Sequence, residues 1–336
     1  MVQLLLHHDT SPTLRDWRYG RCAQVACESN FPDILQRFLD KGVPLEASGE
    51  YRHELLVKTA IEHRSYACLE LLLSTNPRLE REYPPWSAFQ DAIWLNDLRS
   101  FTTLLEHATA RGLMDKPRLE PRGEKTPRRL ADGVLELAAT GAYSGFTVHP
   151  EFVALALKAG GNPNDSSTHW TPFIGACEHA EPSAVRLMLD AGADVNKRCP
   201  SRTPSPVAAA VESKSEEPFF DLVQRGADIT LDDGLIHEAA RRGHAKVAAY
   251  LLDHNASRAP HKDDRRATDL LSEAIKSHYP AVVRTLLEHG FRPGAIDNSR
   301  GDLAATHEDL ARRFAKAPWQ LREQEVLKLI EDSAKN

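Results

Sequence analysis

The chain has 336 residues, 41% of them hydrophobic and 27% charged, and a net charge of −6. These values are typical of a folded domain or repeat array and exclude a wholly disordered chain. The negative charge gives no general reason to expect nucleic acid or an anionic membrane as the partner. Five scattered cysteines without a C-x-x-C pair indicate reduced thiols, and no apolar run is long enough to span a membrane. We therefore expect an intracellular protein, cytoplasmic or nuclear.

A small alanine recurs along the chain at intervals of about 33 residues. It is found at Ala26, Ala60, Ala92, Ala138, Ala176, Ala208, Ala239, Ala274 and Ala311. A second register, of glycine or asparagine, is found at Gly42, Asn76, Gly160, Gly192, Gly226, Asn255 and Gly290. These two residue types adopt positive φ at the least cost, so we expect them to end helices. Two registers with one period predict a repeated structural unit.

Apolar residues at helical spacing lie between the two registers. Ile34, Leu35, Phe38 and Leu39 are an early example, and Val282, Val283, Leu286 and Leu287 a late one. Each unit is therefore predicted to be a pair of short helices that buries its apolar sides by stacking on its neighbours.

The predicted repeat units, in chain order, are 17–49, 52–82, 85–109, 133–165, 168–199, 201–231, 233–262 and 268–300, with a capping unit at 303–334. Together they predict an all-α solenoid of about eight helix pairs plus a C-terminal capping unit, with short projecting turns, as a single domain over residues 1–336. Residues 1–8 resemble the second helix of a preceding unit or a short N-terminal cap.

An inserted flexible loop is expected at residues 110–132, because the alanine register there is longer by about a dozen residues. The alternative is a docking or phosphorylation segment, since Thr126 precedes a proline and two arginines.

The fifth unit has the clearest local signals. Thr171 is predicted to cap the first helix and Pro172 to be its first residue, where a missing N–H group costs nothing. Ala176 allows a second helix to approach closely, and Gly192 is expected to end that helix in the left-handed conformation.

These segments resemble ankyrin repeats. Leu235 to His244 match the first helix and the following G-H turn, while Gly226 to Ile229 and Gly192 to Asn196 match the G-A-D-V-N tail. The first three units depart from the pattern. The resemblance implies that His237 hydrogen-bonds backbone between units. Tetratricopeptide units lack the Gly-Ala-Asp tail, and HEAT and armadillo units are longer.

The turns that join successive units, called fingers below, are expected to project to one side. In ankyrin arrays the fingers and first helices form a concave binding face. Basic and tryptophan side chains near the fingers are the candidate partner-binding residues, because arginine and tryptophan are frequent interface hot spots: Trp86, Trp170, Lys197, Arg198, Arg202, Arg258, Lys262, Arg265 and Arg266. They predict a protein partner with an acidic patch. The alternative interpretation is that these charges only solvate exposed turns and that Trp170 covers a neighbouring leucine.

No motif for catalysis, metal binding or phosphate binding is found, and Cys27 and Cys177 are expected to be core thiols. We therefore expect no enzyme activity, no cofactor, no small-molecule substrate and no membrane insertion. The predicted function is a scaffold or adaptor for protein–protein interaction. Electrostatic binding of nucleic acid or anionic lipid by the basic fingers is the alternative.

Overall fold

A computed structural model describes residues 17–40, 52–75, 86–118, 128–141, 149–166, 170–179, 181–198, 204–232, 234–254, 270–271, 273–274, 277, 279–291 and 328. Fifteen helices and one short two-stranded ladder are found in this part of the chain. The residues group into an N-terminal part, 1–176 with 190–192, and a C-terminal part, 177–189 with 193–336.

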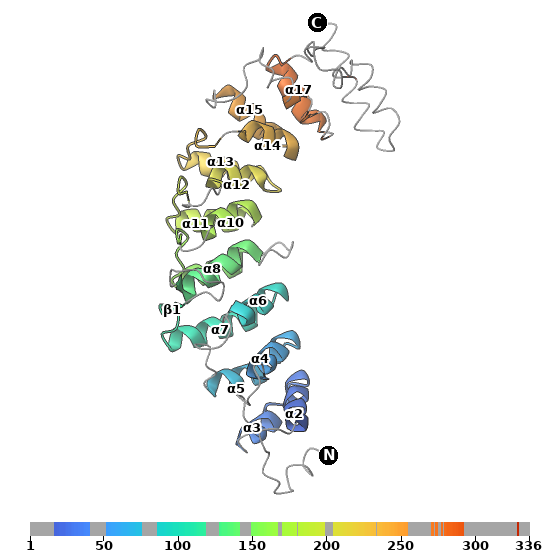
Figure 1. The fold of residues 1–336 in the computed structure, drawn as a ribbon, viewed down its shortest axis with the longest axis vertical. Helices are drawn as coiled ribbons and strands as arrows, with labels where there is room; N and C mark the ends of the chain where they lie inside the picture. The colour runs from blue at the N-terminus through green and yellow to red at the C-terminus, as the bar shows by residue number, and fades with distance from the viewer. Residues whose placement is uncertain are drawn as a thin grey trace. The chain divides into compact units, whose positions relative to one another are not determined.

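The N-terminal part contains stacked helix pairs. Their bounds are α2 Trp17–Glu28, α3 Pro32–Asp40, α4 Arg52–Glu62, α5 Tyr66–Ser74, α6 Trp86–Trp94, α7 Leu98–Ala110, α8 Leu130–Thr140 and α9 Pro150–Lys158. The first helices α2, α4, α6 and α8 contact one another in sequence, and so do the second helices α3, α5, α7 and α9 (Figure 1). Each pair thus buries its apolar sides against the next pair, as a solenoid requires.

The C-terminal part has the same organisation. Its helices are α11 Pro182–Asp190, α12 Pro206–Glu212, α13 Glu217–Gln224, α14 Leu235–Arg242, α15 Ala245–Asp253 and α17 Pro280–Glu288, and helix α10, Pro172–His179, begins in the N-terminal part. First helices α12 and α14 contact each other, and α15 packs on α17. The predicted all-α array of stacked helix pairs is confirmed.

The helix boundaries predicted for the fifth unit are found in the structure. The Ile174 N–H group donates to Thr171 Oγ1 at 3.0 Å, which is the expected cap, and α10 begins at Pro172. Positive φ angles are found at Gly160, Gly192, Gly226 and Gly290. Gly42, Asn76 and Asn255 lie outside the described residues.

Of the eight register alanines in the described residues, all but one are buried, and Ala311 lies outside them. Ala60, Ala92, Ala138, Ala176, Ala239 and Ala274 are all 0% exposed, and Ala26 is 3% exposed. Ala208 is expected in this register from its spacing, but it is half-buried, and its N–H group bonds to the capping Ser205 Oγ at 3.2 Å. Helix α12 begins at Pro206, so the buried small residues of this helix are Ala209 and Ala210 instead.

Regular structure occupies both ends of the segment expected to be an inserted loop at 110–132. Pro117–Arg118 (β1) pairs antiparallel with Arg128–Arg129 (β2), and α8 already begins at Leu130. Leu113 and Met114 are buried, and the Met114 carbonyl accepts the N–H group of Ala131 at 3.0 Å. Residues 111–118 and 128–129 are therefore the two sides of a lengthened finger between α7 and α8, and residues 119–127 lie outside the described residues.

The predicted N-terminal segment 1–8 lies outside the described residues, as does the capping unit 303–334 except for Lys328.

Two features require glycine at position 243: its positive φ angle and the closeness of the Tyr279 ring. Its φ is +82°, and a Cβ atom there would lie 2.5 Å from Tyr279 Cδ1. Gly226 has a φ of +86°, and a Cβ atom there would have no neighbour within 4 Å.

We expect Gly226→Ala to lower the free energy of unfolding by about 1 kcal/mol, from the left-handed backbone alone. Gly243→Ala should cost about 1–3 kcal/mol more, because the Tyr279 ring must move. Urea unfolding of both variants measures the difference, and equal losses would contradict the close packing of Tyr279 on Gly243.

Candidate functional site: the fingers and their supporting contacts

Three fingers share one internal hydrogen bond. In each, a side-chain oxygen accepts the backbone N–H group two residues later, which closes a tight turn. The pairs are Asn162 with Asn164 at 2.9 Å, Asp194 with Asn196 at 3.0 Å and Asp228 with Thr230 at 2.8 Å. A side-chain acceptor at the same place in each finger therefore sets the same local shape.

Each of two fingers is also bonded to the start of the next finger. In the N-terminal part, Asn164 Nδ2 donates to the Gly192 carbonyl at 2.9 Å. In the C-terminal part, Asn196 Nδ2 donates to the Gly226 carbonyl at 3.3 Å, and Asn196 Oδ1 accepts the Asp228 N–H group at 2.8 Å. The carbonyl acceptors belong to glycines with positive φ. The asparagine therefore ties its finger to the end of the next second helix.

Arg198, a predicted partner-binding residue, is partly engaged within the chain. Its guanidinium donates to the Leu231 carbonyl at 3.1 Å and pairs with Asp232 Oδ1 at 2.9 Å. Asp232 Oδ2 also accepts the N–H group of Ser205 at 3.3 Å. The Arg198 side chain is still 47% exposed, so it braces two fingers and keeps one side open to solvent.

Of the other predicted partner-binding residues, the structure describes three. Lys197 and Trp170 are half-buried near their fingers, and Trp86 is the first residue of α6. Arg202, Arg258, Lys262, Arg265 and Arg266 lie outside the described residues. The described part of the chain brings together no cluster of these residues.

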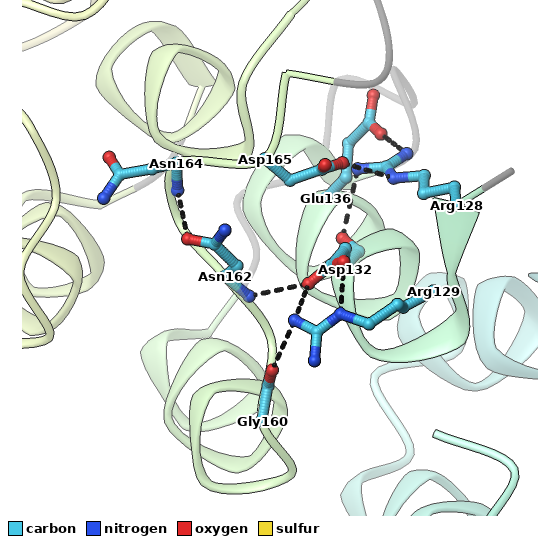
Figure 2. Close-up of polar contacts among 8 residues, drawn as sticks. All are labelled: Arg128, Arg129, Asp132, Glu136, Gly160, Asn162, Asn164 and Asp165. Atoms are coloured by element: carbon cyan, nitrogen blue, oxygen red, sulfur yellow. Dashed lines mark hydrogen bonds and ion pairs between the residues drawn. The ribbon is translucent and has the colours of Figure 1, made fainter. Parts of the chain in front are cut away.

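A buried ionic network holds the base of the lengthened finger, as Figure 2 shows. Arg128 is only 3% exposed; its guanidinium pairs with Glu136 on α8 and with Asp165 Oδ2 at 2.8 Å, and donates to the Asp132 carbonyl at 3.1 Å. An arginine this deeply buried needs several acceptors to offset its lost hydration. The network joins β2, the first two turns of α8 and the following finger at Asp165.

Arg129 continues this network toward solvent. It makes two bonds to the Asp132 carboxylate, at 2.9 and 2.6 Å, and a third to the Gly160 carbonyl at 3.1 Å (Figure 2). The bond to Asp132 is the main cause of the raised pKa of Arg129. Asp132 also accepts the Asn162 N–H group at 2.9 Å, so one carboxylate joins α8 to the next finger.

These contacts bear on the phosphorylation alternative for the inserted segment. That alternative rests on two arginines after Thr126 and Pro127, and both arginines are engaged in the fold. Sequence reasoning missed the acidic partners Asp132, Glu136 and Asp165. Arginines next to a helix start with Asp and Glu in its first two turns were the available signal.

The histidine contacts differ from those implied by the resemblance. His237 Nδ1 lies 3.2 Å from a carboxylate oxygen of Glu273. The ring that reaches backbone of the preceding helix pair belongs to His244, whose Nε2 donates to the Ser213 carbonyl at 2.9 Å. His244 is buried because it follows Gly243, whose positive φ turns the chain back toward α12.

Carboxylates lie on the first helices of the C-terminal part. Burial and the nearby Glu178 and Glu238 raise the pKa of Glu212, while Arg242 opposes this change. Arg242 pairs with Glu238 at 2.7 Å and with Glu212 at 3.9 Å. In this region acidic groups therefore accompany basic ones, and the positive charge predicted for the fingers does not extend over the first helices.

Metal sites and membrane-spanning helices are both absent from the described residues. These residues contain no group of three or more His, Cys, Asp or Glu side chains that could hold a metal ion. None of their helices combines the length and apolar character needed to cross a bilayer.

The buried arginine has an exposed counterpart that serves as a matched control. Arg186 on α11 also bridges two carboxylates, Glu217 and Asp221, each at 2.8 Å, but its side chain is 49% exposed. We expect Arg128→Met to lower the free energy of unfolding by about 3–5 kcal/mol, because it leaves Glu136 and Asp165, whose side chains are 17% and 15% exposed, without their cation. Arg186→Met should change it little, since water screens that pair. Urea unfolding measures both variants; a small effect at Arg128 would show that water reaches its partners.

The bonds between fingers are testable by amide exchange. We expect Asn196→Ala to speed hydrogen exchange of the Asp228 amide several-fold, because that N–H group loses its acceptor. Asn164→Ala removes the corresponding asparagine from the preceding finger and should leave the Asp228 amide unchanged. Exchange followed by NMR or mass spectrometry distinguishes them. Unchanged protection of Asp228 in Asn196→Ala would mean that the finger holds its shape without this bond.

Similarity to known proteins agrees with this geometry. A family model described as "Ankyrin repeats (3 copies)" matches residues 207–297. Ankyrin repeat and SOCS box protein 11 of Danio rerio is 31% identical over 112 residues, which are 32% of this chain and 38% of that protein. The chain thus matches well under half the length of this curated relative.

Two solved structures are similar at lower identity. The ankyrin repeat domain of human ASB11 is 19% identical with a TM-score of 0.46, covering 72% of this chain and 96% of that one. The ankyrin repeat domain of Bcl-3, a member of the IkappaB protein family, is 23% identical with a TM-score of 0.41, covering 60% of this chain and 85% of that one. Residues 207–297 thus match the ankyrin-repeat family, and the stacked helix pairs and recurring finger turns agree with that match.

Proposed function

We propose that this protein is a scaffold or adaptor that binds another protein through its fingers and the adjoining first helices. Ankyrin repeats generally mediate protein–protein interaction. The observation that carries the proposal is the hydrogen bonding that shapes each finger and ties Asn164 and Asn196 to the next one. A finger that is already ordered loses little conformational entropy on binding, so contacts made by its exposed side chains are retained as affinity.

The chemistry of the fingers favours a partner segment with an acidic patch. Lys197 and the exposed side of Arg198 supply positive charge in one described finger. The sequence supplies more at Arg202, in the same connection, and at Arg258, Lys262, Arg265 and Arg266, after α15. The carboxylates on α12 and α14 oppose an acidic ligand on the first helices. We therefore expect the acidic patch of the partner to contact the ends of the fingers. Trp86 and Trp170 are the proposed apolar anchors.

The second candidate is electrostatic binding of nucleic acid or anionic lipid by the same basic fingers. It rests on the same charges, but the net charge of −6 opposes it. Phosphate binding would weaken steeply with salt, because each neutralised phosphate releases counterions. A duplex DNA oligonucleotide and phosphatidylserine vesicles, each titrated at several salt concentrations, are the probes. Neither is expected to bind measurably at physiological ionic strength.

No catalytic role is proposed, since ankyrin repeats are typically non-enzymatic, and no cofactor or small-molecule substrate is assigned. An intracellular location, cytoplasmic or nuclear, is proposed from the reduced Cys22, Cys27, Cys68 and Cys177.

The partner-binding residues are testable in the full chain. A partner is first purified from the native cell with the wild-type protein as bait and identified by mass spectrometry. Its affinity for purified variants is then measured by calorimetry. We expect Trp170→Ala to weaken binding by about 2 kcal/mol, as for an interface hot spot. Arg265→Glu with Arg266→Glu should also weaken it and reduce its salt dependence.

Lys246→Glu, at an exposed position on α15 away from the fingers, is the matched charge control and should leave the affinity unchanged. Equal affinities for wild-type and finger variants would refute the assignment to the fingers. Loss of affinity in Lys246→Glu alone would instead place the partner on the second helices.

A further inference from the structure

Two buried thiols from different helix pairs lie against each other in the N-terminal part. Cys27 on α2 and Cys68 on α5 are both reduced and 0% exposed. The Cys68 thiol donates to the carbonyl of Ala26, the residue before Cys27, with Sγ and O 3.6 Å apart. The two thiols also hydrogen-bond to each other, and helices α2 and α5 are in contact. Neither cysteine belongs to the proposed partner-binding surface.

The repeat itself does not require this pairing. Cys27 follows the buried Ala26 by one residue, a position taken by apolar residues in other first helices, such as Ile61 and Ile93. Cys177 occupies the same position on α10 and is also 0% exposed. A thiol there is thus an ordinary small core residue. The distinctive feature of the first two helix pairs is the second thiol, Cys68, placed against the first.

We propose that Cys27 and Cys68 are a redox-sensitive pair that a hydroperoxide converts into a disulfide linking α2 to α5. Such a bond joins two successive helix pairs covalently. Disulfides that close a long loop stabilise a protein mainly by restricting its unfolded state. The oxidised protein would therefore resist opening of its first two helix pairs, and a thiol reductant would reverse the change.

The order of steps follows from the two thiols' environments. The hydrogen bond from Cys27 lowers the pKa of Cys68, whereas the same bond and burial raise the pKa of Cys27. Cys68 is therefore the first nucleophile, since the thiolate is the reactive form. Its sulfur attacks one peroxide oxygen, an S–O bond forms and the O–O bond breaks. The departing hydroxide takes a proton to become water, and Cys68 becomes a sulfenic acid.

The second step closes the disulfide. Cys27 loses its proton, and its sulfur attacks the Cys68 sulfur. The S–S bond forms as the S–O bond breaks, and the departing hydroxide takes up a proton as a second water. The two sulfurs give up two electrons in total, and hydrogen peroxide is reduced to two waters.

Burial makes access the slow part of the reaction. Both sulfurs are enclosed, so the oxidant reaches them when the pair α2 and α3 opens locally. In the described part of the chain this pair is stacked on α4 and α5 alone, whereas the next two pairs, α4 with α5 and α6 with α7, have a stacked pair on both sides. A pair with one stacked neighbour opens more readily than a pair with two.

The test uses the full chain in a Cys22→Ser background, because no lysine or arginine separates Cys22 from Cys27 and trypsin leaves both in one peptide. The folded protein is treated with hydrogen peroxide, blocked with N-ethylmaleimide, digested and measured by non-reducing mass spectrometry. We expect two peptides linked through Cys27 and Cys68, which dithiothreitol separates. Cys177 should escape oxidation and be found alkylated by N-ethylmaleimide. The oxidised protein should also show a higher thermal midpoint than the reduced one.

Single substitutions test the order of steps. With Cys27→Ser, the sulfenic acid on Cys68 cannot be resolved, so dimedone should label Cys68. With Cys68→Ser, Cys27 should stay alkylated, as Cys177 does. Circular dichroism checks that both variants fold, and the linked peptide in the Cys22→Ser protein tests the proposal without either of them. Oxidation of Cys27 and Cys68 no faster than Cys177, or linkage of either to a different cysteine, would overturn it.

Discussion

Short helices cannot bury their apolar sides within a single pair, and every other feature of this protein depends on stacking between pairs. Small residues allow neighbouring helix pairs to pack closely. A Cβ atom at Gly175 on α10 would lie 2.5 Å from Thr140 Cγ2 on α8. Fully buried alanines such as Ala60 and Ala92 serve the same purpose. Because each pair contacts only its neighbours, stability is a sum of local terms, and a change in one pair is felt mainly by the next.

Stacking also sets the geometry of the fingers. Neighbouring pairs place one finger beside the next, where an asparagine amide reaches the carbonyl of a glycine with positive φ. That carbonyl is available because the helix has ended there and no helical N–H group takes it. The same residue that terminates a helix therefore provides the acceptor that holds the preceding finger, and the proposed binding surface follows from the way the helices end.

The lengthened finger is supported differently, by charge. The fingers that follow it are tied by the hydrogen bonds of Asn164 and Asn196 and by the exposed Arg198–Asp232 pair, whereas Arg128 is buried among Glu136, Asp165 and the Asp132 carbonyl. A buried ion pair adds little net stability compared with apolar packing, but losing one partner is costly. Such a network favours one arrangement of β2 and α8 over others. The proposed thiol pair lies two helix pairs earlier, so oxidation there would leave this finger's supporting contacts in place.

The sequence alone determined the fold class, because period, helix-ending glycines, buried alanines and caps such as Thr171 are local signals. It also identified Cys27 and Cys177 as core thiols, and both are fully buried. It misplaced the register alanine of α12 by two residues, at Ala208 in place of Ala210, because the start of α12 depends on the Ser205 cap and Pro206 rather than on spacing. The pairing of Arg128 with Asp165, of His244 with the Ser213 carbonyl and of Cys27 with Cys68 was decided only by the tertiary structure. Those contacts join residues some 30 to 40 positions apart. The period of the sequence specifies which helix pairs are neighbours, but it does not specify which side chains meet between them.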